Sequence, residues 1–318
     1  MKILIAESRG FSPAALQTLR GVAEVVEADL DRAGLLSACG DIDILWVRLR
    51  NQIDAEVFDA APQLKVVVTP TTGLNHIDQQ EAARRGIRIV SLKGEVAFLK
   101  DVRATAELTV GLMLMLMRNL LPAATDSLRG NWNRDAFQGH ELYGKTVGII
   151  GYGRLGHIVA RYLQAFDMRV LVTDPDLDSE ELGPGLTRVP LAKLLRDSDI
   201  VSLHVNLCDD TYGFFGSNEF DAMQPGAWFI NTARGELVDE QALLNALRSG
   251  RLAGAALDVL CDEQSTGMGH NELVEYAKTH PQLIITPHIG GCTHESMEKT
   301  ERFLAGRLVA KLAAGATS

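Results

Sequence analysis

The chain has 318 residues and a mass of 34.6 kDa, and 46% of its residues are hydrophobic. This apolar content is enough to offset the entropy of ordering, so a disordered chain is excluded and about two domains are expected. The chain has 31 Lys and Arg residues and 41 Asp and Glu residues, which gives a net charge of −10. That balance argues against nucleic acid as a partner, because phosphate binding needs clustered cations.

Five compact apolar runs in the first hundred residues predict buried strands: Ile3–Ala6, Ala23–Val26, Ile44–Val47, Leu64–Val68 and Ile87–Leu92. Three stretches between them have the spacing of helices: Pro13–Leu19, Ala55–Ala61 and Ile77–Arg85. Strands that alternate with helices indicate a parallel sheet covered on both faces.

The pattern changes near residue 99, where a Leu- and Met-rich segment predicts a long helix from Leu99 to Gly130, broken near Pro122. A second strand–helix series follows. Its predicted strands are Thr146–Ile150, Arg169–Thr173, Ile200–Val205, Trp228–Asn231, Ala253–Leu257 and Leu283–Thr286, and its helices are Leu155–Phe166, Leu191–Arg196 and Glu240–Ser249. The last helix, Glu295–Ala314, is expected to return to the first domain. We therefore predict one domain from residues 1–98 and 287–318, and a second from residues 99–286.

The strongest motif joins the strand Thr146–Ile150 to the next helix and contains Gly151, Gly153, Arg154, Leu155 and Gly156. In a strand–turn–helix context, GxGxxG predicts a dinucleotide site. The first glycine permits the turn, the second admits a pyrophosphate, and the third lets helix and strand pack closely. The helix N-terminus then offers N–H groups to the phosphates.

Asp174 ends the following strand, 18 residues after Gly156. A carboxylate at about this distance binds the ribose hydroxyls of NAD and repels the 2′-phosphate of NADP. We therefore predict NAD as the cofactor. No metal site is expected.

Three ionisable residues, Arg234, Glu263 and His288, each come shortly after a predicted strand. In open parallel sheets, ligands bind at the carboxyl ends of the strands. A histidine there can supply a proton near neutral pH. A carboxylate partner favours the charged imidazolium, and an arginine offers a planar fork for a carboxylate.

The sequence resembles the D-isomer-specific 2-hydroxyacid dehydrogenase family, which includes phosphoglycerate dehydrogenases and glyoxylate/hydroxypyruvate reductases. The matching segments span nearly the whole chain: Gly73–Asp78, Ala106–Leu108, Val147–Gly156, Ser202–Leu207, Asn231–Asp239, Ala253–Val259 and Thr286–Gly291. The resemblance implies an α/β fold of two doubly wound parallel-sheet domains, a Rossmann NAD-binding domain inserted into a flavodoxin-like substrate domain. It also implies interconversion of a small D-2-hydroxy acid and its 2-keto acid, in a cleft between the two domains.

The family pattern assigns catalytic roles to three residues of this chain: His288 as acid/base, Glu263 as its partner and Arg234 as substrate anchor. Gln264 follows Glu263 where the family usually has proline, so the chain departs from the family pattern at this point. Besides the glycine turn and Asp174, the pattern predicts further residues on the cofactor side: Asn206, Thr211, Thr232, Ala233, Asp258 and Gly290. His204 is expected to be structural or to line the cofactor.

The first domain is expected to supply the substrate side. Thr72, Gly73 and Leu74 follow a strand, and successive N–H groups around a glycine can bind a carboxylate. Arg48 and Arg50 lie near the end of another strand, on one face if that strand continues. Resemblance to the phosphoglycerate-type members implies that Arg48 reaches the substrate, although exposed arginines explain the pair about as well.

The helical region Leu99–Asn133 resembles the part through which family members dimerise, so a homodimer is expected. The widely spaced cysteines read as free thiols, and the most apolar run, Leu108–Leu121, is short of the ~20 residues that span a bilayer. We expect a cytoplasmic protein with no membrane partner. Two alternative functions are a phosphite-type oxyanion dehydrogenase and an NAD-sensing, peptide-binding corepressor.

Overall fold

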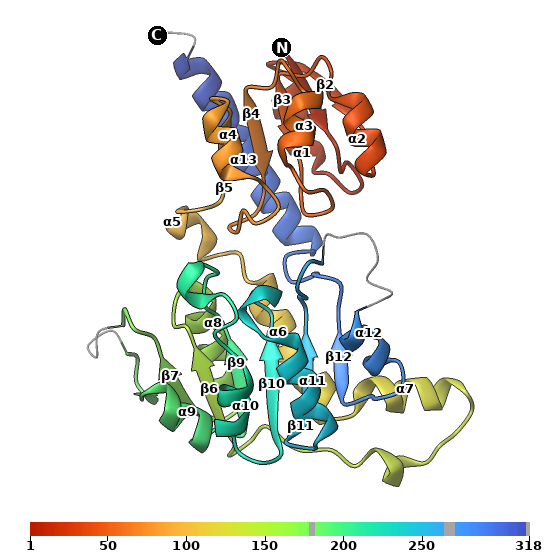
Figure 1. Ribbon diagram of the computed structural model, residues 1–318, viewed down its shortest axis with the longest axis vertical. Coiled ribbons are helices and arrows are strands. Elements are labelled where there is room, and N and C mark those ends of the chain that lie inside the picture. The colour runs from red at the N-terminus through yellow and green to blue at the C-terminus, as the bar shows by residue number, and fades with distance from the viewer. Residues whose placement is uncertain (178–181, 264–270, 316–318) are drawn as a thin grey trace. The chain divides into compact units, whose positions relative to one another are not determined.

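The computed structural model describes residues 1–177, 182–263 and 271–315 and divides the chain into two units. Unit 1 comprises Met1–Val102 and Cys292–Ser318, and unit 2 comprises Arg103–Gly291. Each unit is built around its own parallel sheet (Figure 1). The predicted insertion of one α/β domain into another is therefore the arrangement that the chain adopts.

Unit 1 has a five-stranded parallel sheet in the order β2-β1-β3-β4-β5, the flavodoxin-like order. Its strands are β1 (Lys2–Ile5), β2 (Glu24–Glu27), β3 (Ile44–Trp46), β4 (Val66–Thr69) and β5 (Arg88–Ser91). Its helices are α1 (Pro13–Arg20), α2 (Arg32–Ala38), α3 (Ala55–Ala60), α4 (Gln79–Arg84), α5 (Val96–Leu99) and α13 (His294–Gly315). The inner strand β4, between β3 and β5, is buried along its whole length, which is why it reads as an unbroken apolar run.

Helix α13 returns to unit 1 after the chain has passed through unit 2. It packs against α1, and its residues Leu304 and Leu308 are buried in the same core cluster as Ile3 and Ile5 of β1. The amphipathic tail of the sequence thus completes a core that the first hundred residues begin.

Unit 2 has a seven-stranded sheet in the order β12-β11-β10-β9-β6-β7-β8, a Rossmann order extended by one strand, and all its pairs are parallel. The strands are β6 (Thr146–Ile150), β7 (Arg169–Thr173), β8 (Leu186–Arg188), β9 (Ile200–Leu203), β10 (Ala227–Asn231), β11 (Leu252–Leu257) and β12 (Leu283–Ile285). The α-helices are α6 (Ala104–Met117), α7 (Leu120–Leu128), α8 (Arg154–Gln164), α9 (Leu191–Asp197), α10 (Ser217–Ala222), α11 (Glu240–Arg248) and α12 (Glu272–Ala277). Short 3-10 turns cover Arg134–Phe137, Asp209–Thr211 and Gly235–Leu237.

The two crossings between the units lie a few residues later than the sequence pattern suggested, after Val102 and after Gly291. Helix α6 packs on α8 and on strands β10, β11 and β12, so it belongs with unit 2. The turn after β12 is hydrogen-bonded to Asp258 of unit 2, and it therefore stays with that unit as far as Gly290.

The span of the predicted long helix holds α6 and α7, preceded by the end of α5, and its main break lies at Asn119, close to the break predicted near Pro122. Asn119 adopts a left-handed backbone with φ of 52°, and α6 and α7 meet there at a bend of 66°. Pro122 is tolerated in the first turn of α7, where backbone N–H groups have no partner within the helix. Among the described residues no single helix is long and apolar enough to cross a membrane. The bent stretch from α5 to α7 has the length and composition of a span, and no more than that.

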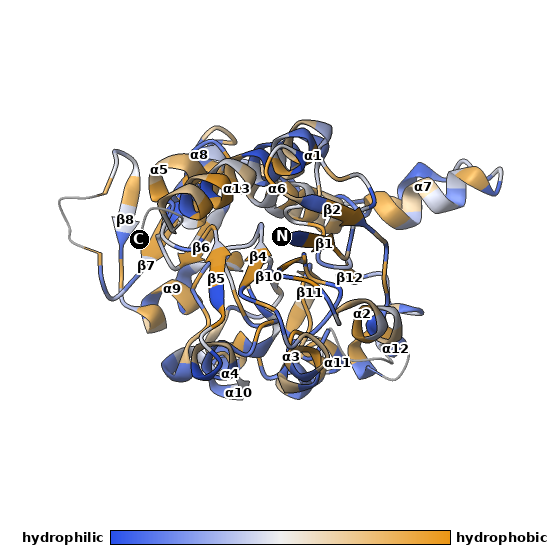
Figure 2. Cartoon of the chain, turned by 90° about the horizontal axis from the view of Figure 1, so that it is seen from above, coloured by the Kyte–Doolittle hydropathy of each residue, from blue (hydrophilic) through white to orange (hydrophobic). Residues whose placement is uncertain are grey.

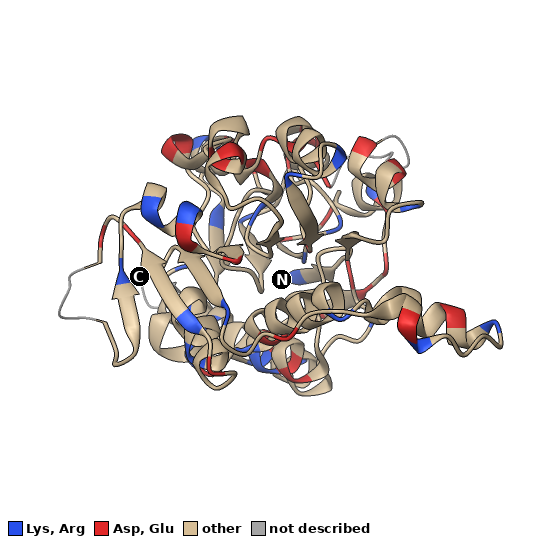
Figure 3. Ribbon diagram, turned by 90° about the horizontal axis from the view of Figure 1, so that it is seen from below, with Lys and Arg blue, Asp and Glu red and all other residues tan. Residues whose placement is uncertain are grey.

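Helices α6 and α7 have opposite surroundings. Met113 and Met117 of α6 are buried in the core of unit 2, whereas no residue of α7 is buried. Figure 2 shows α7 projecting from the rest of unit 2 with hydrophobic bands along it. In Figure 3 the same helix carries acidic and basic bands toward its far end.

Candidate active site

The glycine-rich turn between β6 and α8 has the backbone geometry that its sequence predicts. Gly151 has a φ of 89°, and a Cβ there would lie 2.7 Å from the carbonyl carbon of His204. A Cβ on Gly156 would lie 2.0 Å from the carbonyl oxygen of Gly151. Gly153 is the N-cap of α8, and its Cβ would meet nothing within 4 Å. The turn is therefore closed on its strand side and open in front of the helix N-terminus, as a pyrophosphate requires.

Asp174 lies against this turn. Its Oδ2 accepts the Tyr152 N–H at 2.7 Å and its Oδ1 accepts the Asp176 N–H at 3.0 Å. The two bonds hold the carboxylate at the end of β7, beside the strand that leads into the glycine turn. The turn, the helix end and Asp174 together fit NAD, with phosphates at α8 and a ribose hydroxyl at the carboxylate.

Arg234 follows β10 in a turn that Asn231 organises. The Asn231 side chain donates to the Arg234 carbonyl oxygen at 2.8 Å and accepts the Ala233 N–H at 3.0 Å. Burial lowers the pKa of Arg234, and the nearby carboxylates of Glu263 and Glu236 oppose that effect. A largely desolvated guanidinium at the carboxyl edge of a parallel sheet is suited to binding an anion.

His288 and Glu263 form a hydrogen-bonded pair, with His288 Nδ1 on Glu263 Oε1. His288 itself has a φ of 50°, a strained value for a residue with a side chain. Its N–H donates to the Asp258 carbonyl oxygen at 2.8 Å. Since Glu263 engages Nδ1, proton exchange with a substrate would use Nε2.

Asp258 holds the turn that carries His288. It is 1% exposed, and its carboxylate accepts the Thr286 hydroxyl at 2.6 Å and the N–H groups of Ile289 and Gly290 at 2.9 and 2.7 Å. Burial raises the pKa of Asp258, and these three donors oppose the increase. The sequence pattern placed Asp258 on the cofactor side, and in the structure its carboxylate is engaged by this turn.

Glu240 of α11 fixes the segment that bears Glu263, a role that sequence reasoning missed. Its Oε1 accepts the Cys261 N–H at 2.7 Å, and its Oε2 accepts the Asn271 side-chain N–H at 2.9 Å. A Cβ on Gly235 would lie 2.0 Å from the carbonyl carbon of Leu260. This close approach brings the turn after Arg234 against the segment that ends at Glu263. Gln264, the residue that departs from the family pattern, lies outside the described residues.

The other predicted cofactor residues lie on loops at the ends of β9, β10 and β12. Thr211 donates to the Asn206 carbonyl oxygen at 2.8 Å, so these two residues shape one loop. Thr232 is bonded through its hydroxyl to Thr109 of α6 at 2.8 Å. A Cβ on Gly290 would lie 3.0 Å from Asp258 Oδ2, which leaves little room for a larger residue. Contact of these residues with the cofactor stays a prediction.

His204, which follows β9, is a structural histidine in this fold. Its Nε2 lies 2.9 Å from the Ser202 hydroxyl, and its N–H donates to the Ile150 carbonyl oxygen at 2.7 Å. Burial lowers the pKa of His204 to about 4. It is therefore neutral near pH 7 and packs against the glycine turn.

The predicted carboxylate cradle of unit 1 is the turn after β4. The Thr71 hydroxyl donates to the Gly73 carbonyl oxygen at 2.7 Å and lies 3.1 Å from the Thr69 hydroxyl, which in turn lies 3.0 Å from His76 Nε2. Within the described ranges, no hydrogen bond from the N–H groups of Thr72, Gly73 or Leu74 is found. The buried His76, which sequence reasoning did not single out, thus anchors a turn whose N–H groups can donate hydrogen bonds to a ligand.

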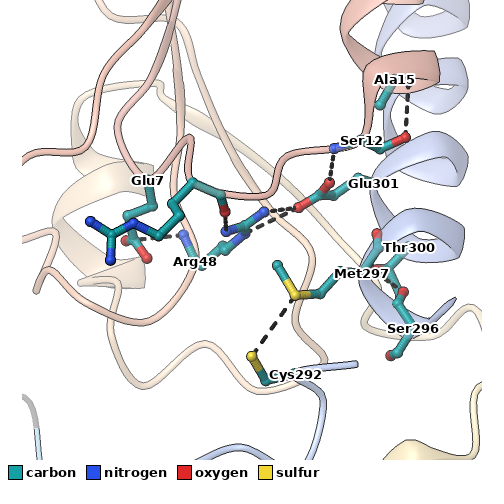
Figure 4. Close-up of polar contacts among 10 residues, drawn as sticks. Glu7, Ser12, Ala15, Arg48, Cys292, Ser296, Met297, Thr300 and Glu301 are labelled. Carbon is teal, nitrogen blue, oxygen red and sulfur yellow. Dashed lines mark hydrogen bonds and ion pairs between the residues drawn. The ribbon is translucent and has the colours of Figure 1, made fainter. Parts of the chain in front are cut away.

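Arg48 and Arg50 do not continue a strand, because β3 ends at Trp46. The buried Glu7 carboxylate accepts the N–H groups of both arginines, at 3.1 and 3.2 Å, and bends the chain there. Arg48 then pairs with Glu301 of α13 (Figure 4), while Arg50 pairs with Asp29 at 2.7 Å. The two side chains therefore have separate partners, and the expectation of one shared face does not hold.

Together, the parallel sheet, the phosphate-binding turn and the His288–Glu263 pair beside Arg234 define a class of protein: an NAD-dependent enzyme. Comparison with known proteins narrows this class. The model of the D-isomer specific 2-hydroxyacid dehydrogenase NAD binding domain matches residues 110–290.

Whole-chain comparisons agree. A glyoxylate reductase of Thermococcus gammatolerans is 37% identical over 295 residues, covering 89% of this chain and 84% of the relative. A D-3-phosphoglycerate dehydrogenase of Archaeoglobus fulgidus is 34% identical over 97% of this chain, which spans 57% of that protein. The crystal structure of an Aquifex aeolicus D-lactate dehydrogenase with NAD and lactic acid superposes with a TM-score of 0.85, at 26% identity and coverage of 99% and 97%. The chain belongs to the D-isomer specific 2-hydroxyacid dehydrogenase family and is an NAD-dependent enzyme of that family.

Proposed function

We propose that the protein reduces a small 2-keto acid to the D-2-hydroxy acid, with His288 as the proton donor, Glu263 as its partner and Arg234 as the anchor of the substrate carboxylate. The observation that carries this proposal is the His288–Glu263 pair beside the desolvated Arg234. Relatives with this fold are named for glyoxylate, 3-phosphoglycerate and lactate. All three substrates have a carboxylate next to the reacting carbon.

In the reducing direction, the hydride for the carbonyl carbon would come from NADH held at the glycine turn and Asp174. Arg234 holds the substrate carboxylate and polarises the carbonyl oxygen, so that negative charge developing on this oxygen is stabilised. His288 transfers its Nε2 proton to that oxygen and becomes neutral, which completes the hydroxyl group. Glu263 keeps the ring oriented through Nδ1, which leaves Nε2 for the transfer. The N–H groups of the Thr72–Leu74 turn are proposed to bind the substrate carboxylate as well.

A substrate panel tests this proposal. We expect oxidation of NADH, followed at the nicotinamide absorbance, with glyoxylate or hydroxypyruvate, and a clear preference for NADH over NADPH because Asp174 repels the 2′-phosphate. His288→Asn should lower kcat by about 10³-fold. The matched control is His280→Asn, at a histidine that stacks on Tyr276, and it should keep wild-type kcat. Oxidation of phosphite with NAD, or peptide binding without turnover, would instead support one of the alternative functions.

We also propose a homodimer in which α7 packs against a second copy. Leu121 is 53% exposed, and Leu128 and Trp132 are 91% and 92% exposed. Exposed apolar side chains on a projecting helix and on the segment that follows it are typical of an interaction surface.

Light scattering tests the dimer. The wild-type chain should have twice the mass of 34.6 kDa, and Leu121→Asp with Leu128→Asp should give the monomer mass. Val22→Asp changes a hydrophobic residue that is 41% exposed on unit 1 and should leave the dimer intact. A monomeric wild-type protein, or a dimer that survives both changes in α7, would contradict the proposal.

A further inference from the structure

A buried histidine, His76, is hydrogen-bonded to the turn that follows β4 in unit 1. It is 1% exposed, and its Nε2 lies 3.0 Å from the hydroxyl oxygen of Thr69, the last residue of β4. The Thr69 hydroxyl lies 3.1 Å from the Thr71 hydroxyl, which donates to the Gly73 carbonyl oxygen at 2.7 Å. A series of three hydrogen bonds therefore connects the imidazole ring to the backbone of the turn.

The direction of each hydrogen bond in this series is determined by its last acceptor. A carbonyl oxygen can only accept, so the single proton of the Thr71 hydroxyl is donated to Gly73. Thr71 must then accept from the Thr69 hydroxyl. Because the Thr69 hydroxyl has donated its own proton, it must accept from His76. The Nε2 of His76 therefore carries a proton.

Hydrogen bonds to two carbonyl groups of the turn determine where its N–H groups point. In a trans peptide unit, the C=O and the N–H that follows it point in opposite directions. The Thr71 carbonyl oxygen accepts the Leu92 N–H at 3.0 Å, which orients the N–H of Thr72. The Gly73 carbonyl oxygen accepts the Thr71 hydroxyl, which orients the N–H of Leu74. This second orientation depends on the series of hydrogen bonds that begins at the buried imidazole.

The N–H groups of this turn are available to a ligand. Those of Thr72, Gly73 and Leu74 have no acceptor within the part of the chain that the structure describes. Successive N–H groups around a turn form a concave binding site for an anion. A small carboxylate has the acceptor oxygens that such a site needs.

We infer that His76 is a positioning residue that holds this turn of unit 1 in the conformation that binds a carboxylate. Its Nε2–H sets the hydrogen-bond direction in Thr69 and Thr71, and the Thr71 hydroxyl then orients the N–H of Leu74. The inference rests on the proposed function, in which the carboxylate belongs to the substrate. Loss of the series should weaken carboxylate binding and leave the affinity for NADH, which depends on the glycine turn of unit 2, unchanged.

Two substitutions of His76 differ in where they place an N–H group. Gln puts its side-chain amide near the position of Nε2 and can donate to Thr69, whereas the shorter Asn puts it near Nδ1 and cannot. His76→Asn should raise the KM for glyoxylate by about tenfold, because the hydrogen bond that holds the turn is lost. His76→Gln should retain most of the wild-type affinity. The Kd for NADH, measured by nicotinamide fluorescence, should be the same in both variants. An unchanged KM in His76→Asn would overturn the inference.

Substitution of Thr69 tests the middle of the series. Thr69→Val removes the hydroxyl at nearly constant volume and should also raise the KM for glyoxylate by about tenfold. Thr69→Ser retains a hydroxyl and should stay close to the wild-type KM. The matched control is Thr18→Val in α1, where the hydroxyl donates to the Ala14 carbonyl oxygen at 3.0 Å, and it should not change the KM. Equal KM values for Thr69→Val and Thr69→Ser would contradict the inference.

Nitrogen NMR of the wild-type protein tests the hydrogen-bond direction without any substitution. The Nε2 of His76 should have the chemical shift of a protonated ring nitrogen. The N–H resonances of Thr72, Gly73 and Leu74 should move when oxamate, a small carboxylate that is not reduced, is added to the protein with NADH. An unprotonated Nε2, or N–H resonances that do not respond to oxamate, would overturn the inference.

Calorimetric binding of oxamate to the protein with NADH separates this inference from the proposed function, because it needs no turnover. If Thr69→Val weakens oxamate binding by about tenfold while no 2-keto acid is reduced, the proposed function fails and the inference stands. If 2-keto acids are reduced and Thr69→Val binds oxamate as tightly as the wild-type protein, the inference fails and the function stands. A wild-type protein that does not bind oxamate would also overturn the inference.

Discussion

The two sheets of this protein both carry an arginine and a glutamate at their carboxyl edges, but the charges are used differently. In unit 2, Arg234 is desolvated with Glu263 nearby, and Glu263 is hydrogen-bonded to His288. In unit 1, Arg48 is bonded directly to Glu301, which is fully buried. The unit 2 edge has a desolvated guanidinium near a histidine–glutamate pair, whereas the unit 1 edge has its guanidinium bonded directly to a buried carboxylate.

This difference follows from how each glutamate is held. Glu263 is 24% exposed in its side chain and follows Asp262, which has a φ of 52°. Glu301 lies in the middle of α13, whose neighbouring residues Leu304 and Ala305 are packed in the unit 1 core. A carboxylate on a loop can adjust its position to its histidine partner, while one on a packed helix is held against a single arginine. Position at the carboxyl edge of a parallel sheet therefore does not by itself determine how an arginine and a glutamate are paired.

The largest expected effect comes from removing the cation of the unit 2 edge. Arg234→Met should lower kcat/KM for a 2-keto acid by about 10³-fold, or about 4 kcal/mol, because the substrate carboxylate loses its charged fork. Arg234→Lys retains the charge without the planar fork and should recover part of that loss. Steady-state kinetics on both variants would measure the loss of kcat/KM and its partial recovery. Equal kinetics for Met and Lys would show that the charge of Arg234 does not bind substrate.

The corresponding change in unit 1 should affect stability. Arg48→Met leaves the Glu301 carboxylate buried and unpaired, and the free energy of unfolding should fall by about 3 kcal/mol at pH 7. Denaturant titration measures this loss. The double variant Arg48→Met/Glu301→Gln carries no buried charge at this position and should be more stable than Arg48→Met alone. Equal free energies of unfolding for Arg48→Met and the double variant would show that an unpaired Glu301 charge does not destabilise the protein.

Much of this architecture can be predicted from the sequence, because it depends on local patterns. The strands Thr146–Ile150 and Arg169–Thr173 were predicted with the bounds that the structure has, since each is a short apolar run followed by a turn residue. The short strand β8 and helix α2 were missed, because neither has a strong periodic pattern. The break between α6 and α7 depends on the left-handed backbone of Asn119. In the sequence, the signal for a break is the nearby Pro122.

The site residues divide in the same way. Arg234, Glu263 and His288 follow strands in sequence, so their clustering could be predicted from topology. The partners of Arg48 could not be predicted, because Glu301 is 253 residues away along the chain and reads as an ordinary polar residue of a helix. Glu240 was missed for a similar reason: its hydrogen bonds to Cys261 and Asn271 depend on how two loops fold back on α11.

Unit 2 also allows a comparison of two histidines. His204, like His288, follows a strand at the carboxyl edge of the sheet, but we expect it to affect only the stability of the fold. Burial lowers its pKa to about 4 from the usual 6.5, so below pH 6.5 the unfolded chain binds a proton that the folded chain does not. Stability from this residue is therefore full above pH 6.5 and falls as the pH drops toward 4. Between pH 6.5 and 4.5 the loss should be about 2 kcal/mol.

Urea titrations at both pH values give the loss of unfolding free energy for the wild-type protein and for His204→Gln. Subtracting the loss in the variant from the loss in the wild-type protein removes the contribution of the carboxylates, which both proteins share. The variant should lose less stability on acidification, and parallel losses in the two proteins would mean that His204 is protonated in the fold.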